Sequence, residues 1–203
     1  MNKGILRDAG ILFVITLVAG FLLGAVHEVT AAPIAAARMA AAIATYQEVF
    51  PEAANFAQSD ELTAQIAASA DEISAQGFGN VSVDDIMIAE DASGNAIGYL
   101  VSATSNDGYG GAVQVSVGIS ADETLTGIGF LTLNETAGLG MNADQPTYKN
   151  QWIGKPLGVY SVTKTTPASD LEIAAISGAT FTSNASTNAV NAAVYFVQNC
   201  MNQ

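Results

Sequence analysis

The chain has 203 residues, half of them hydrophobic, and its mean hydropathy of +0.32 is high for a soluble domain. Nineteen acids against six bases give a net charge of −13, which makes nucleic acid and other polyanions poor partners. One cysteine, Cys200, and one histidine, His27, exclude an intrachain disulfide, a cysteine-rich metal site and a Ser-His-Asp triad in the body of the chain. The sequence therefore predicts no metal site.

The N-terminal segment predicts one transmembrane helix. No charged residue occurs from Ala9 to Val26, and at about 1.5 Å per residue this run spans about 27 Å, close to the hydrocarbon thickness of a bilayer. Lys3 and Arg7 precede the run and Glu28 follows it, so the positive-inside rule places the N-terminus in the cytoplasm and the rest of the chain on the outer face. A cleaved signal peptide is the alternative, although the run is longer than a usual signal-peptide core.

Two further helices are expected after the anchor. Thr30 and Pro33 resemble the start of an alanine-rich helix, which Pro51 would end. The segment Asp60–Gln76 predicts a second helix that Gly77 terminates.

Beyond Gly77 the hydrophobic period changes to two, which predicts an antiparallel meander with one buried face. The turn-forming segments DASGN, SNDGYGG and SADET separate strands expected at Ile86–Ala89, Ala96–Ala103, Ala112–Ile119 and Leu125–Leu133. Trp152 and the run Val159–Lys164 suggest one more strand.

A last helix follows, with one apolar face formed by Ala189, Val190, Ala193, Val194 and Val197. Together the elements predict an α+β fold, in which a transmembrane helix precedes an antiparallel sheet with packed helices. The expected division is 1–30 for the N-terminus and anchor, 31–76 for a helical connection that begins the outer domain, and 77–203 for the main domain.

Four hydroxyl side chains gather in SGATFTS, Ser177–Ser183, just before the last helix. Three lysines fall shortly upstream, at Lys149, Lys155 and Lys164. A bound phosphate would explain both features, because hydroxyls and free N–H groups at a helix start donate to it and a lysine offsets its charge. The alternative is that Thr182 or Ser183 simply caps the helix.

A second glycine-bearing segment, ETAGLG at Glu135–Gly140, follows the last meander strand. Its two glycines allow a tight turn and the close approach of a flat ligand or another strand. By itself this signal is weak.

Taken with WIGK at Trp152–Lys155 and with SGATFTS, the segment resembles the FMN-binding domain of the G subunit of the Rnf electron-transport complex and of the C subunit of the sodium-pumping NADH:quinone reductase. The anchor, VFP at Val49–Pro51 and the segment GYGGAVQVSVGI match the family layout, so the resemblance covers nearly the whole chain. The length favours the Rnf G subunit. The family usually has proline at the position of Ala137 and often has aspartate at that of Ala174.

The resemblance implies that Thr180 bears FMN through a phosphoester bond, made by a separate flavin transferase. It implies that Lys155 lies near the phosphate. The other implied cofactor-binding residues are Ser177, Gly178, Ala179, Thr182 and Ser183 around the attachment turn, and Glu135, Thr136, Gly138, Leu139 and Gly140 in the ETAGLG loop. No catalytic residue is implied.

The implied function is that of an electron-relay subunit among the other subunits of a membrane complex, which couples ferredoxin and NAD redox chemistry to movement of Na⁺ or H⁺. The chain alone is not expected to act on a substrate. Two alternatives stay open: a tethered reductase that binds flavin non-covalently, and a cofactor-free acidic interaction domain. Tyr109, Tyr99 and Trp152 could stack on a flavin or lie in the core.

Overall fold

The computed structural model describes residues 3–201, and its first element is a single long helix, α1 (Lys3–Val49). The segment Arg7–Ile34 of this helix is long and apolar enough to cross a membrane. The expectation that a new helix begins near Thr30 and Pro33 is wrong. The Thr30 hydroxyl donates to the Val26 carbonyl at 2.8 Å instead of capping a helix, and α1 continues through Pro33.

The chain divides into two compact units, one ending at Ala42 and the other beginning at Ile43. The second unit contains the last turns of α1 and everything that follows. Residues 43–76, which fall within the segment predicted as a helical connection and start of the outer domain, lie in this second unit.

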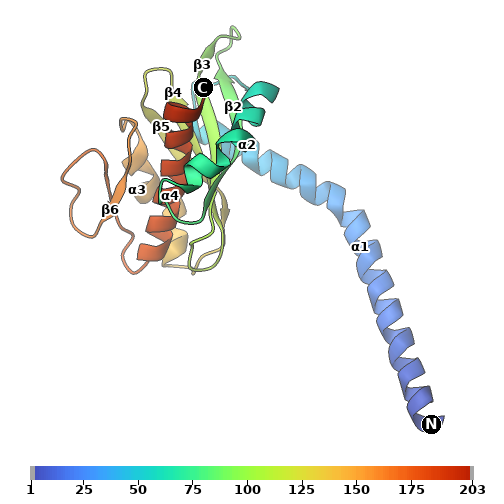
Figure 1. The fold of residues 1–203 in the computed structure, drawn as a ribbon. Coiled ribbons are helices and arrows are strands. Elements are labelled where there is room, and N and C mark those ends of the chain that lie inside the picture. Colours follow the sequence, from blue (N-terminus) through green and yellow to red (C-terminus); the bar gives the residue numbers. More distant parts are fainter. Residues whose placement is uncertain (1–2, 202–203) are drawn as a thin grey trace. The chain divides into compact units, whose positions relative to one another are not determined.

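A five-stranded antiparallel meander forms the centre of this unit, which confirms the predicted α+β fold (Figure 1). The strands pair in chain order, and the register places Val113 opposite Leu133. Within this sheet the short edge strand β1 was not predicted, because its four residues are too few to show an alternation. The strands are β1 (Asn55–Gln58), β2 (Val81–Glu90), β3 (Ala96–Ser105), β4 (Val113–Ser120) and β5 (Leu125–Leu133).

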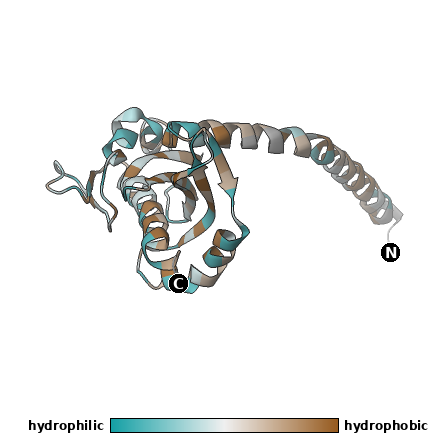
Figure 2. Cartoon of the chain, turned by 90° about the horizontal axis from the view of Figure 1, so that it is seen from above, coloured by the Kyte–Doolittle hydropathy of each residue, from teal (hydrophilic) through white to brown (hydrophobic). Residues whose placement is uncertain are grey.

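Helices α2 (Asp60–Ser74) and α4 (Thr180–Tyr195) cover one face of the sheet (Figure 1). Ser59 caps α2 by accepting a hydrogen bond from the Leu62 N–H at 3.4 Å. The predicted apolar residues of α4 share one buried cluster with the valines of β4, while Val197, beyond the end of the helix, is partly buried. Hydrophobic colour accordingly marks parts of the strands and of the helices (Figure 2). This layer is the main core.

The end of α1 covers the opposite face of the sheet. Gly118 and Gly129 lie under it, and a Cβ on Gly129 would come within 2.8 Å of the Val49 side chain. The Thr126 hydroxyl donates to the Val49 carbonyl at 2.7 Å. Small residues on this face therefore allow the helix end to rest directly on the strands.

The segment between β5 and α4 is mostly irregular. Trp152 lies fully buried in a 3₁₀ turn, so the strand suggested at that residue is wrong. The strand expected from Val159 is shorter than predicted and pairs in parallel, in a separate two-stranded sheet. The elements here are 3₁₀ turns at Gly140–Asp144 and Asn150–Trp152, helix α3 (Pro146–Lys149), β6 (Ser161–Thr163) and β7 (Glu172–Ala174), while a π turn at Phe196–Cys200 follows α4.

Lys149 joins the end of α1 to this irregular segment. Its ammonium lies 2.7 Å from a Glu48 oxygen and 3.1 Å from an Asp144 oxygen, and its side chain is only 12% exposed. Burial would lower the pKa of Lys149, but the hydrogen bonds and charges of Glu48 and Asp144 outweigh burial and raise it. The ion pairs therefore favour the folded state.

Lys149→Met is expected to lower the free energy of unfolding by about 1 kcal/mol at pH 7, because both acids are more than half exposed and regain water. A raised folded-state pKa means that the contribution is complete below the unfolded pKa and is lost as the pH rises through the folded value. Denaturant unfolding of the two proteins at pH 7 and above pH ~10.5 tests this. An equal difference at both pH values would contradict it.

Candidate functional site

Two loops leave the same end of the sheet and pack against each other. Because Val113 pairs with Leu133, the loop before β4 and the loop after β5 start side by side. Gly110 lies against the Asn134 carbonyl so closely that any side chain there would collide with it. The Tyr109 N–H donates to the Glu135 carboxylate at 2.9 Å, which ties the two loops together.

The ETAGLG loop begins with a type II turn. The Leu139 N–H donates to the Thr136 carbonyl at 3.1 Å, and Gly138 has φ +76° while Ala137 has no positive φ. The 3₁₀ turn that follows starts at the buried Gly140. A Cβ on Gly140 would lie 2.5 Å from Thr182 Oγ1 and 2.7 Å from Glu135 Cβ, so glycine lets this loop pack on the first turn of α4.

Helix α4 starts at Thr180 and has no side-chain cap, which excludes the interpretation that Thr182 or Ser183 caps it. The Ser183 hydroxyl instead accepts from the Ile176 N–H and donates to the Ala179 carbonyl, both at 2.9 Å. Ser183 thereby holds the SGAT turn in place from inside the helix. Gly178, at φ +76°, makes the turn itself possible.

The two motifs meet in one pocket of about 380 Å³. Eight of the predicted site residues line it: Glu135, Thr136, Leu139, Gly140, Gly178, Ala179, Thr180 and Thr182. Two more residues line it: Tyr109, which the sequence offered as a possible stacking residue, and Phe181, which was not predicted. The pocket therefore combines hydroxyls and one carboxylate with aromatic and aliphatic surface.

Four predicted residues do not line this pocket. Gly138 shapes the turn, Ser183 holds the helix start, and Ser177 faces a neighbouring pocket. Lys155 lies beside the first residue of β5, where its carbonyl accepts from the Leu125 N–H at 2.9 Å, while the pocket lies beyond the last residue. Nine strand residues at about 3.3 Å each separate the two, so the structure does not bring Lys155 to the pocket.

Exposed aromatic side chains distinguish this pocket from the core. Tyr109 is 75% exposed and Phe181 is 68% exposed, whereas Trp152 is fully buried between other aromatic rings and has no access to a ligand. In the sequence both aromatic residues stand in glycine-containing motifs, GYGG and SGATF, although Phe181 is the second residue of α4. Exposed aromatic surface of this kind suits stacking on a flat ring.

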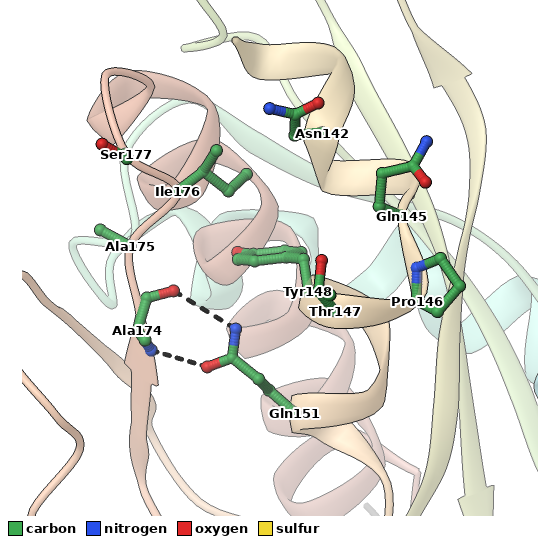
Figure 3. Close-up of a pocket in the computed structure, with 10 residues that line it drawn as sticks. All are labelled: Asn142, Gln145, Pro146, Thr147, Tyr148, Gln151, Ala174, Ala175, Ile176 and Ser177. Carbon is green, nitrogen blue, oxygen red and sulfur yellow. Dashed lines mark hydrogen bonds between the residues drawn. The ribbon is translucent and has the colours of Figure 1, made fainter. Parts of the chain in front are cut away.

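A second pocket of about 510 Å³ lies on the other side of the SGAT turn (Figure 3). Residues 174–177 form one wall, and α3 with the preceding 3₁₀ turn forms the other. Gln151 accepts from the Ala174 N–H at 2.8 Å and donates to its carbonyl at 3.4 Å, so it occupies the edge of β7 (Figure 3). Burial raises the pKa of Tyr148 to about 12, and its hydroxyl bonds Ser186 at 2.7 Å. None of the residues that line this pocket is charged at pH 7.

Two family models match the chain. The FMN-binding domain matches residues 108–195, and the RnfG N-terminal region matches residues 1–49. A relative from Acetobacterium woodii, the G subunit of the Na(+)-translocating ferredoxin:NAD(+) oxidoreductase complex, is 35% identical over 93% of this chain and 89% of its own. The chain belongs to the Rnf G-subunit family.

Other comparisons agree with membership of the Rnf G-subunit family. The G subunit of the proton-translocating ferredoxin:NAD(+) oxidoreductase complex of Clostridium ljungdahlii is 33% identical over 59% of this chain and 64% of its own. The crystal structure of the C subunit of the Na(+)-translocating NADH-quinone reductase of Parabacteroides distasonis superposes with a TM-score of 0.52 at 18% identity, covering 74% of this chain and 79% of that one. That likeness concerns the fold.

Ala137→Pro is expected to raise the free energy of unfolding by about 0.4–1 kcal/mol. Ala137 is the second residue of the type II turn, where proline has the right φ, and its N–H makes none of the described hydrogen bonds. Thermal melting of the two proteins in the same detergent measures the difference. Ala75→Pro is the control. The Ala75 N–H donates to the Asp71 and Glu72 carbonyls at the end of α2, so proline there should be destabilising.

Proposed function

We propose that this chain carries FMN covalently on Thr180 and relays electrons within an Rnf-type complex. The observation that carries the proposal is the convergence of ETAGLG and SGATFTS on one pocket whose lining includes Thr180. The names of the relatives, which are subunits of ferredoxin:NAD(+) oxidoreductase complexes, support the assignment of the complex. Movement of Na⁺ or H⁺ would belong to the assembled complex.

The residues present fit FMN. Tyr109, Leu139 and Phe181 offer exposed apolar surface to the flat ring system, while Thr136 and Thr182 offer hydrogen bonds to polar atoms. Thr180 sits at the first position of α4, where backbone N–H groups have no partner within the helix and can donate to a phosphate. FMN, when bound, accepts electrons and passes them on.

The ester forms when the Thr180 hydroxyl oxygen bonds to the flavin phosphorus of a flavin dinucleotide, and the nucleoside monophosphate half leaves with the hydroxyl proton. A separate flavin transferase would catalyse this step. Thr180 is thus an attachment residue, and no residue of this chain has to act as an acid, base or nucleophile towards a substrate. A covalent bond prevents loss of the cofactor and fixes its place between redox partners.

In this proposal α1 anchors the chain in the cell membrane with its N-terminus in the cytoplasm, and the globular unit lies on the outer face. The apolar segment Arg7–Ile34 and the basic residues at its start support this arrangement. The other subunits of the complex would surround the anchor and supply the electron donor and acceptor.

The test is the intact mass of the full-length protein from its own host membrane, together with a denaturing gel viewed under ultraviolet light. We expect a mass increased by FMN less one water, and a fluorescent band that survives denaturation. An unmodified mass in cells with an active flavin transferase would overturn the proposal and favour a non-covalent flavin protein or a cofactor-free interaction domain.

A further inference from the structure

Among the residues that the structure describes, no cationic side chain lines the proposed flavin pocket. Of its ten lining residues, only Glu135 is charged. The three lysines of the globular unit are engaged or placed elsewhere: Lys149 pairs with Glu48 and Asp144, Lys155 donates to the Asp170 carbonyl at 2.6 Å, and Lys164 does not line the pocket. A phosphate in this pocket would therefore meet a carboxylate and no lysine.

Glu135 already supplies an anion at the start of α4. Its Oε1 accepts from the Tyr109 N–H at 2.9 Å, which fixes the side chain. A Cβ built on Gly140 would lie 2.9 Å from Glu135 Oε2 and 2.5 Å from Thr182 Oγ1. Both oxygens therefore surround Gly140, and the carboxylate lies beside the first turn of α4. The positive end of a helix dipole favours one anion nearby, and here the protein provides it.

A free phosphate and an esterified one differ in charge. The phosphate of free FMN is a monoester, which carries about −1.5 to −2 at pH 7. The diester formed with Thr180 has lost one ionisable oxygen and carries a single negative charge. A carboxylate without a neighbouring cation repels the first more strongly than the second.

We propose that this pocket selects against the phosphate dianion, that Glu135 is the residue that sets this selectivity, and that the pocket accepts a neutral flavin at least as well as free FMN. The inference rests on the proposed function, since it concerns the same pocket. It gives covalent attachment a physical reason: the ester keeps in place a nucleotide that the pocket would otherwise bind weakly.

The experiment uses full-length Thr180→Val in detergent, titrated with riboflavin and with FMN while flavin fluorescence is recorded. We expect FMN to bind no more tightly than riboflavin. Raising the salt from about 50 mM to about 500 mM should strengthen FMN binding and leave riboflavin binding unchanged, because salt screens repulsion. FMN binding that is at least tenfold tighter and weakens with salt would overturn the inference, as would failure of both ligands to bind.

Glu135→Gln in the same background isolates the carboxylate. The amide oxygen can still accept from the Tyr109 N–H, so the loop should stay in place. The affinity for FMN relative to that for riboflavin should rise about 3- to 10-fold. Asp122→Asn, an exposed acid in the turn between β4 and β5 at the other end of the sheet, makes the same change in net charge and should alter neither affinity. Equal effects of the two variants would attribute selectivity to overall charge and overturn the role of Glu135.

The intact mass of the wild-type protein separates this inference from the proposed function. If the wild type carries the flavin mass but the Thr180→Val variant binds FMN more tightly than riboflavin, the inference is wrong and the proposed function stands. If the wild type carries no flavin mass but its pocket binds riboflavin more tightly than FMN, covalent attachment is wrong and the selectivity is confirmed.

Discussion

Thr180→Val is expected to remove the covalent flavin completely. Valine keeps the β-branched shape that the start of α4 accommodates but has no hydroxyl oxygen to form the ester. Thr180 is partly exposed in the pocket wall, so the change should leave the fold intact. The measurement is the intact mass and the in-gel fluorescence of the variant beside the wild type, both from the native host membrane.

Two variants make this result specific to one oxygen. Thr180→Ser keeps a hydroxyl and should retain part of the label, although it loses the methyl group that restricts the side chain. Thr182→Val removes the neighbouring hydroxyl, which is buried beside Gly140, and should retain the label. A full label on Thr180→Val, or its loss only in Thr182→Val, would show that the attachment residue has been misassigned.

The parts of the site that the sequence predicted are those set by local chemistry. The ETAGLG and SGATFTS segments carry glycines at positive φ, Gly138 and Gly178, so their turns are encoded within a few residues. Ala189, Val190 and Ala193, which share one helix face, are buried as their spacing predicts, while Asn191 and Ala192 are buried as well. Local pattern and final structure agree at these places because neighbouring residues alone determine them.

The parts that the sequence could not predict depend on distance through the fold. Lys155 stands only 25 residues before Thr180 in the chain. In the fold it lies beside Leu125 at the start of β5, whereas the pocket lies beyond the other end of that strand. Tyr109 is remote in the chain and reaches the pocket only because Val113 and Leu133 are paired. Proximity along the sequence therefore misplaced the cation, and it could not decide whether Tyr109 lies in the core or at the pocket.

Pro33 shows the same limit at the level of one helix. A proline after a threonine is a typical helix start, but α1 has already formed its hydrogen bonds through the apolar segment before it. In such a segment the backbone gains more from continuing the helix than from exposing its polar groups. Thr30 and Pro33 therefore predicted a helix start, but α1 continues through both residues.

The largest loss of stability is expected from Trp152→Ala. Trp152 is fully buried, and its ring makes edge contacts with Tyr148 at 6.4 Å and Tyr160 at 5.2 Å between ring centroids. Removing the indole leaves a cavity at this position between β5 and β6, which should lower the free energy of unfolding by about 3–5 kcal/mol. For a unit of this size the melting temperature should fall by about 6–20 °C.

Thermal unfolding of the full-length protein in detergent, followed by near-ultraviolet circular dichroism, measures this effect. Trp152→Phe should cost only about 1–2 kcal/mol, because it keeps an aromatic ring and removes an indole N–H that has no acceptor among the described residues. Ile153→Ala shortens the adjacent side chain, which is 59% exposed, and should change stability by less than about 0.5 kcal/mol. Similar losses in Trp152→Ala and Ile153→Ala would contradict a core role for the indole.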